Sequence, residues 1–175
     1  MLQTTGRLSS RSLREALPRA GQLSVLAWPV DRPATLQAFA MREVLSAGRR
    51  GFDTVVLDLP RHRDAVIDET ISRCDHVVLV STLTVPGVSS AARVAHRLPE
   101  ATPARHLVTR GSRGGVAPES VSRLLRIPLL AAMADQRGLD ESINLGAGPA
   151  RSRRGTLARA ARSAANALLE QRAAA

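Results

Sequence analysis

The sequence predicts an α/β fold, a doubly wound and mostly parallel sheet flanked by helices, and three observations support it. Short apolar runs that suit buried strands alternate with segments whose apolar residues recur at helical spacing. Prolines, glycines and small polar residues mark most of the boundaries between them. Strands that alternate with helices are joined by right-handed crossovers, which make the strands parallel and cover both faces of the sheet.

The first elements are short and follow a lead-in at residues 1–9, which is expected to be flexible. Ser10 or Ser12 caps a predicted helix that Pro18 stops, because proline cannot continue a helix. Residues 22–28 then form an apolar run that predicts a strand.

The next pair of elements carries the most informative part of the chain. An acidic residue and a proline open a predicted helix over residues 31–47. Residues 52–59 follow, with a continuous Val-Val-Leu run that is typical of a strand buried on both faces. This strand ends on Asp58, and a carboxylate at a strand's carboxyl end lies at the edge of the sheet where ligands bind.

The alternation continues to the end of the chain. The remaining helices are predicted over residues 64–73, 86–98, 118–125, 135–145 and 156–172, and the remaining strands over residues 76–81, 105–109 and 128–133. Together these elements predict one domain over residues 10–172, with a basic loop at residues 146–155 before the terminal helix.

The composition limits the partners. The net charge of +10 favours contact with nucleic acid or anionic lipid, but all 25 basic residues are arginines, which also suits the codon bias of a GC-rich genome. Two phenylalanines and one tryptophan make aromatic stacking a poor basis for binding. The single cysteine, Cys74, excludes an internal disulfide, and no apolar stretch approaches the ~20 residues that span a bilayer, so we expect a cytoplasmic protein.

The order of these segments resembles the carboxyl-terminal part of the ParA/MinD superfamily, and more narrowly its actinobacterial CpaE-like septum-site-determining proteins. The segments that carry the resemblance extend over nearly the whole chain and lie at residues 12–18, 23–28, 50–61, 74–80 and 125–130, followed by the arginine-rich terminal helix.

The resemblance implies a P-loop ATPase fold and a dimeric spatial switch, acting with partner proteins in septum placement or in pilus and secretion positioning. ATP and Mg²⁺ are the implied cofactors. The family's phosphate loop, with its glycines and two lysines, lies upstream of the first residues here, and this chain contains no lysine. Either the chain is truncated or it is a degenerate relative, so by itself it is expected to be inactive as an ATPase.

By the same resemblance, Asp58 takes the place of the Walker B aspartate, which holds Mg²⁺ through water. Pro60 follows it, and Thr109 and Arg110 lie where the family contacts the nucleotide base, although an asparagine is usual there. The alternative for Asp58 is an aspartate that caps the following turn.

Three further segments have two interpretations each. The glycine-rich residues 111–115 could form an anion-binding nest, although a plain loop is preferred. The terminal helix could reach a membrane, but its mostly alanine face favours packing on the sheet. Arg151, Arg153 and Arg154 form a basic loop that could bind DNA nonspecifically or remain solvated.

Two other function classes stay open. One is a basic nucleic-acid-binding module on the same fold, and the other is a small Rossmann-like enzyme that uses Asp58 as a ribose or metal ligand. The four histidines have no metal-ligand spacing, and no nucleophile elbow is present in the sequence.

Overall fold

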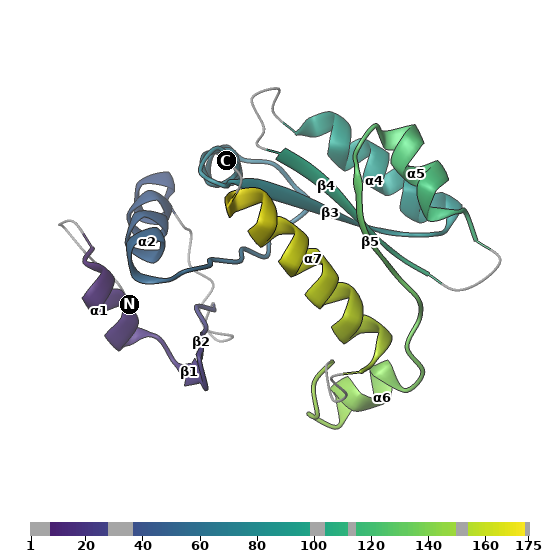
Figure 1. The fold of residues 1–175 in the computed structure, drawn as a ribbon. Helices are drawn as coiled ribbons and strands as arrows, with labels where there is room; N and C mark the ends of the chain where they lie inside the picture. Colours follow the sequence, from purple (N-terminus) through teal and green to yellow (C-terminus); the bar gives the residue numbers. More distant parts are fainter. Residues whose placement is uncertain (1–7, 28–36, 99–103, 112–114, 150–153, 174–175) are drawn as a thin grey trace. The chain divides into compact units, whose positions relative to one another are not determined.

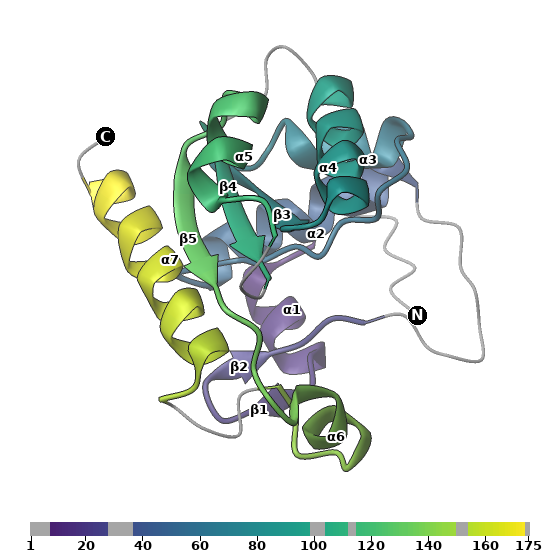
Figure 2. The same ribbon diagram turned by 90° about the vertical axis from the view of Figure 1, so that its right-hand side faces the viewer.

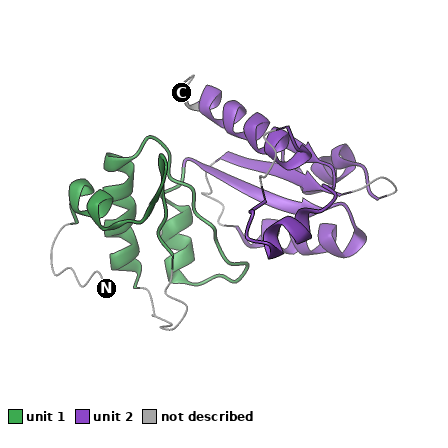
Figure 3. Cartoon of the chain, turned by 90° about the horizontal axis from the view of Figure 1, so that it is seen from below, with its two compact units in different colours: residues 1–74 green, residues 75–175 purple. Residues whose placement is uncertain are grey.

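The computed structural model describes residues 8–27, 37–98, 104–111, 115–149 and 154–173. The chain divides into two compact units, residues 1–74 and residues 75–175, which Figure 3 shows in green and purple.

The second unit is built on a three-stranded parallel sheet of β3 (His76–Thr82), β4 (Ala104–Arg110) and β5 (Leu129–Met133), in the order β3-β4-β5. Helix α4 (Val85–Arg97) connects β3 to β4, and α5 (Pro118–Leu125) connects β4 to β5 (Figure 1). The predicted α/β fold with a parallel sheet is confirmed.

Helices cover both faces of this sheet, as a doubly wound fold requires. Helices α4 and α5 lie on one face, and α7 (Thr156–Ala173) crosses the other face, where it packs against β5 (Figures 1 and 2). The short helix α6 (Leu139–Asn144) lies between β5 and α7 in the chain. The terminal helix therefore packs on the sheet, as its alanine-rich face predicted.

The core of this unit lies between the sheet and helices α4 and α5. Five buried side chains form it: Leu83, Val88, Leu107, Val121 and Ile127. Leu107 of β4 and Val121 of α5 are fully buried in this core. Removing such residues from water is the main favourable contribution to folding.

Glycines bring the loops at the carboxyl end of the sheet close together. A Cβ at Gly87, in the first turn of α4, would lie 2.7 Å from the carbonyl oxygen of Thr82 and against its hydroxyl. A Cβ at Gly111 would lie 2.8 Å from the Cβ of Leu83, and one at Gly115 would meet the Leu83 carbonyl oxygen. Neither Gly111 nor Gly115 has a positive φ, so close packing explains these two glycines. Residues 112–114 lie outside the described residues, and the anion-binding nest stays a prediction.

The first unit contains α1 (Ser10–Ala16), α2 (Ala38–Gly51), α3 (Ala65–Ile71) and a two-stranded antiparallel pair, β1 (Arg19–Ala20) and β2 (Leu23–Ser24). Ser9, one residue before the predicted cap, caps α1 by accepting from the Ser12 N–H at 3.0 Å. The side chain of Arg14 joins α1 to α2 by donating to the Gly51 carbonyl oxygen at 2.6 Å.

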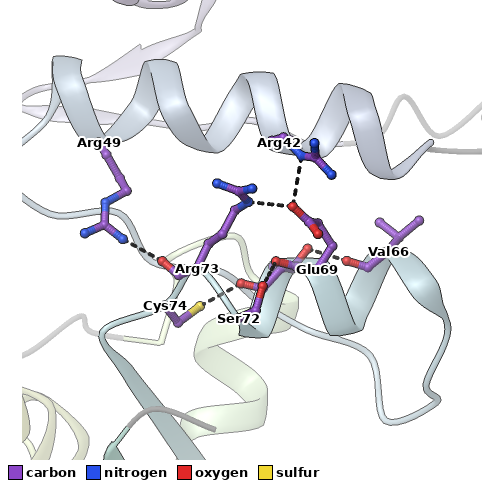
Figure 4. A network of polar contacts seen from close by, with 8 residues as sticks. Arg42, Arg49, Val66, Glu69, Ser72, Arg73 and Cys74 are labelled. Atoms are coloured by element: carbon purple, nitrogen blue, oxygen red, sulfur yellow. Dashed lines mark hydrogen bonds and ion pairs between the residues drawn. The ribbon is translucent and has the colours of Figure 1, made fainter. Parts of the chain in front are cut away.

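Charged side chains join α2 to α3. Glu69 accepts from Arg42 on α2 at 3.0 Å and from Arg73 at 2.7 Å, while Arg49 donates to the Arg73 carbonyl oxygen at 2.6 Å (Figure 4). The hydrogen bond from Arg73, supported by the one from Arg42, holds the pKa of Glu69 below its usual range. The Glu69 carboxylate thus helps to hold α2 and α3 side by side.

Three sequence predictions in this unit are wrong in detail. Within residues 22–27, the predicted strand is reduced to β2. Residues 31–36 of the predicted helix lie outside the described residues, and α2 runs from Ala38 to Gly51, beyond the predicted end at residue 47. Residues 52–63 form no strand at all, and Val56 is 88% exposed. An apolar run becomes a buried strand only when neighbouring strands satisfy its backbone groups, and no described strand of this unit pairs with it.

Two histidines meet on neighbouring strands of the second unit. Nδ1 of His76 on β3 lies 3.1 Å from Nε2 of His106 on β4, and His106 is 6% exposed. Burial, together with the nearby His76, lowers the pKa of His106. One of the two nitrogens must be unprotonated to accept this hydrogen bond, so the pair does not tolerate two charged rings.

We expect the two helical glycines Gly87 and Gly48 to respond oppositely to alanine. Gly87→Ala should lower the free energy of unfolding by about 1–3 kcal/mol, because the new Cβ meets the backbone of Thr82. Gly48→Ala should raise it by up to about 1 kcal/mol, since a Cβ there makes an ordinary 3.4 Å contact with Val55. Urea denaturation measures both, and equal effects would contradict the close packing at Gly87.

We expect stability to fall as the pH drops below about 6.5, the ordinary pKa of histidine. The pKa of His106 is lower in the folded protein than in the unfolded chain, so lowering the pH protonates the unfolded chain first. The contribution of neutral His106 to the free energy of unfolding is therefore fully present above that pH. It is lost as the pH falls through the lowered pKa of the folded protein. Thermal unfolding between pH 7.5 and 5 should show this slope, and His106→Leu should flatten it. The exposed His96→Gln is the control, and an unchanged slope in His106→Leu would refute the assignment.

Candidate functional site

The carboxyl ends of the parallel strands form the candidate site in the second unit, because ligands of open α/β sheets bind at this edge. Two residues predicted from the sequence, Thr109 and Arg110, end β4 and therefore lie at this edge. In the register of the sheet, Thr109 is opposite Ser81 of β3 and Ala132 of β5.

Thr109 is completely buried, and its hydroxyl oxygen has no hydrogen-bond partner among the described residues. Ser81 beside it is also buried, and its hydroxyl donates to the Thr82 carbonyl oxygen at 3.1 Å. A buried hydroxyl without a partner costs free energy, so Thr109 is an unusual residue for this buried position. Sequence reasoning missed Ser81, although a polar residue near the end of an apolar strand is a usable signal.

Arg110 is held in place by both its backbone and its side chain. Its carbonyl oxygen accepts from the Leu83 N–H at 2.8 Å, and its Nε lies 3.7 Å from a carboxylate oxygen of Asp135. Both side chains are largely exposed, so this ion pair is weak and leaves the guanidinium accessible. Asp135 was not predicted as a site residue, although it follows β5 as Asp58 follows its own apolar run.

Asp58 and Pro60 lie in the first unit, in the segment at residues 52–63 that forms no strand, and both are exposed. The structure therefore does not place Asp58 at the end of a strand. The roles of Asp58, Pro60, Thr109 and Arg110 in nucleotide binding stay predictions.

The basic loop before α7 is described only in part. Arg151 and Arg153 lie outside the described residues, while Arg154 is exposed and takes part in a polar interaction. Within the described part of the chain, no group of three histidine, cysteine or acidic residues could hold a metal ion. No helix there is long and apolar enough to cross a bilayer.

The residues present do not make a complete site for ATP and Mg²⁺. The accessible Arg110 guanidinium suits polar contacts to a base or an anion, whereas the Thr109 hydroxyl is buried away from the surface. A phosphate loop of the P-loop type also needs a lysine, and the chain has none. The edge of the sheet can thus orient a polar ligand, but the groups that would hold a triphosphate are not among these residues.

We expect Thr109→Val to be neutral or to raise the free energy of unfolding by up to about 1 kcal/mol, since it removes a buried hydroxyl without a partner. Thr70→Val is the matched control. Thr70 is equally buried, but its hydroxyl donates to the Val66 carbonyl oxygen at 2.7 Å, so its loss should cost about 1 kcal/mol. Urea denaturation compares the two, and a larger cost at Thr109 would show that its hydroxyl is bonded in the folded protein.

Comparison with known proteins adds relatives and a fold. No protein-family model matches the chain. Two uncharacterized proteins of Mycobacterium tuberculosis, MT3760 of strain CDC 1551 and Rv3660c of strain H37Rv, are each 40% identical to it over 158 residues. The alignment takes in 90% of this chain and 45% of each relative, so the chain spans about half the length of these relatives.

Two solved structures share the arrangement of helices and strands. The MinD cell division protein of Aquifex aeolicus superposes with a TM-score of 0.67 at 14% identity, over 77% of this chain and 61% of that one. The cell division ATPase MinD of Pyrococcus furiosus superposes with a TM-score of 0.63 at 18% identity, over 77% and 59%. The chain therefore has the ParA/MinD-like α/β fold of these two proteins.

Proposed function

We propose that this chain is the carboxyl-terminal part of a MinD/ParA-like regulator that positions a cell-division or secretion machine, and that ATP binding requires residues outside it. The fold supports the general class. The narrower assignment to the CpaE-like proteins, a role in pilus positioning, and action through dimerisation with partner proteins belong to the proposal.

The observation that carries the proposal is the incomplete burial of the sheet at β3. Among the described residues β3 pairs with β4 alone, so the backbone groups along its other edge have no strand partner. Val78 and Val80, on one face of the same strand, are exposed, Val80 by 63%. An apolar edge strand of this kind is a liability that proteins normally cover. This supports a sheet that further strands complete.

The first unit also exposes apolar side chains of a segment predicted to be a buried strand. Val55 and Val56 are exposed in the segment that the sequence predicts to be a buried strand. Continuous apolar runs of this kind occur in strands with neighbours on both edges and layers on both faces. A strand that pairs with this segment would be expected in the part of the family's sequence that carries its first strand and phosphate loop.

Without that loop, the chain alone should neither bind nor hydrolyse ATP. Nucleotide affinity in P-loop proteins comes from backbone N–H groups and a lysine around the phosphates, with an aspartate acting on the metal ion. Arginine is a poor substitute in so narrow a cradle, because its forked guanidinium needs more room than an ammonium group. Asp58 would contribute only once the phosphates are held.

Isothermal titration of Mg-ATP into the purified chain tests the nucleotide part of the proposal. We expect no saturable binding tighter than about 1 mM, with wild type and Asp58→Ala indistinguishable. Circular dichroism of both proteins confirms that they are folded.

A dissociation constant of about 1 μM that depends on Mg²⁺ and is lost in Asp58→Ala would overturn the proposal, because the chain would then hold a complete site. Micromolar binding that survives Asp58→Ala would also contradict it, and would direct attention to Thr109 and Arg110 instead.

A further inference from the structure

A hollow lies at the opposite end of the second unit from the candidate site. It has a volume of about 370 Å³ and is bounded by the last turns of α4 and α5 and the start of β4. Its floor is apolar and consists of Ala92, Ala95, Leu125 and Ile127. We call it the α4–α5 hollow. It opens at the amino end of β4, whereas Thr109 and Arg110 end the same strand.

The rim of the α4–α5 hollow carries basic side chains. His96, Arg105 and Arg126 line it together with the apolar floor, and no acidic residue does so among the described residues. Within the described part of the chain, the side chains of His96 and Arg126 make no hydrogen bond or ion pair, although other arginines of this unit do, such as Arg110. An apolar floor under such a rim is complementary to an apolar group flanked by carboxylates.

The backbone at Arg126 supports a role for its side chain. Arg126 follows α5 with φ of 54° and ψ of 38°, and it is the one non-glycine residue with a positive φ among the described residues. Helices that end in this conformation usually place glycine there, since a Cβ costs about 1 kcal/mol. A residue held in a strained conformation at the rim of a hollow points to a function for what it carries.

Leu124 also lines the hollow and is 67% exposed. A single large apolar side chain on a surface is ordinary, but here it adds to the apolar lining of the hollow. A small anion would occupy only part of the volume of about 370 Å³ and would leave Leu124 uncovered. A chain segment with two neighbouring aliphatic residues would cover both.

We propose that the α4–α5 hollow binds an acidic peptide segment of a partner protein. One aliphatic side chain of the segment lies on the floor and a second covers Leu124. Flanking carboxylates pair with Arg126 and accept a hydrogen bond from an imidazole N–H of His96. The proposal is independent of nucleotide binding, because the hollow and the candidate site lie at opposite ends of β4.

Fluorescence anisotropy with the labelled peptide Asp-Glu-Leu-Leu-Asp-Glu and the full chain tests the proposal. Wild type should bind it saturably, and Arg126→Gly should weaken binding by about fivefold or more, the value of one charge-assisted contact. Glycine suits the positive φ, so this variant should be at least as thermally stable as wild type. Arg126→Lys keeps the charge but loses the forked guanidinium, so its affinity should lie between those of wild type and Arg126→Gly.

Two controls separate recognition from general attraction to a protein of net charge +10. Arg159→Gln removes one exposed arginine from α7, on the other face of the sheet, and should leave the affinity unchanged. The peptides Asp-Glu-Ser-Ser-Asp-Glu and Asn-Gln-Leu-Leu-Asn-Gln remove the apolar or the anionic part, and each should bind at least fivefold more weakly.

The proposal fails if wild type does not bind the first peptide, or if Arg126→Gly and Arg159→Gln weaken it equally. It also fails if either control peptide binds as tightly as the first. Binding to phosphatidylglycerol vesicles with no binding to the peptide would reject the peptide and assign the surface to a membrane.

Discussion

The hydrogen-bonded ladder between β3 and β4 is the constraint on which the second unit depends. Its parallel register places His76 near His106 at one end and Ser81 beside Thr109 at the other. It also sets the level at which α4 and α5 cover the fully buried Leu107. The histidine pair and the two buried hydroxyls thus follow from one register, and a slip of one residue would turn each of these side chains to the opposite face.

Much of this unit could be predicted from the sequence, because its elements carry their own local signals. The threonine before α4, the proline in its first turn, the proline at the start of α5 and the apolar runs of the strands are read without tertiary information. The segment at residues 52–63 could not be predicted in this way. Its apolar run indicates side chains that suit a buried strand, but a strand forms only where neighbouring strands satisfy its backbone N–H and C=O groups. This segment has the apolar sequence pattern but no described strand that pairs with it.

The candidate site also has a part that the sequence predicts and a part that it does not. Thr109 and Arg110 could be assigned to the edge of the sheet because the strand that carries them was predicted with nearly correct bounds. The unpartnered state of the Thr109 hydroxyl, and the ion pair between Arg110 and Asp135, depend on side-chain packing that no spacing encodes. The same holds for Arg126, since arginine is a common residue in this chain, and its positive φ gives no signal in the sequence.

Because the chain contains no lysine, arginine is the fixed cation at both ends of the sheet. Every fixed positive side-chain charge in this chain is a planar guanidinium, which pairs well with carboxylates in a forked geometry and poorly with a phosphate enclosed by backbone. At the carboxyl end this leaves Arg110 in an exposed pair with Asp135, and the groups that would enclose a triphosphate are lacking. At the amino end the same chemistry suits an open rim with Arg105 and Arg126. A fold shared with ATPases is therefore not by itself an argument for catalysis here.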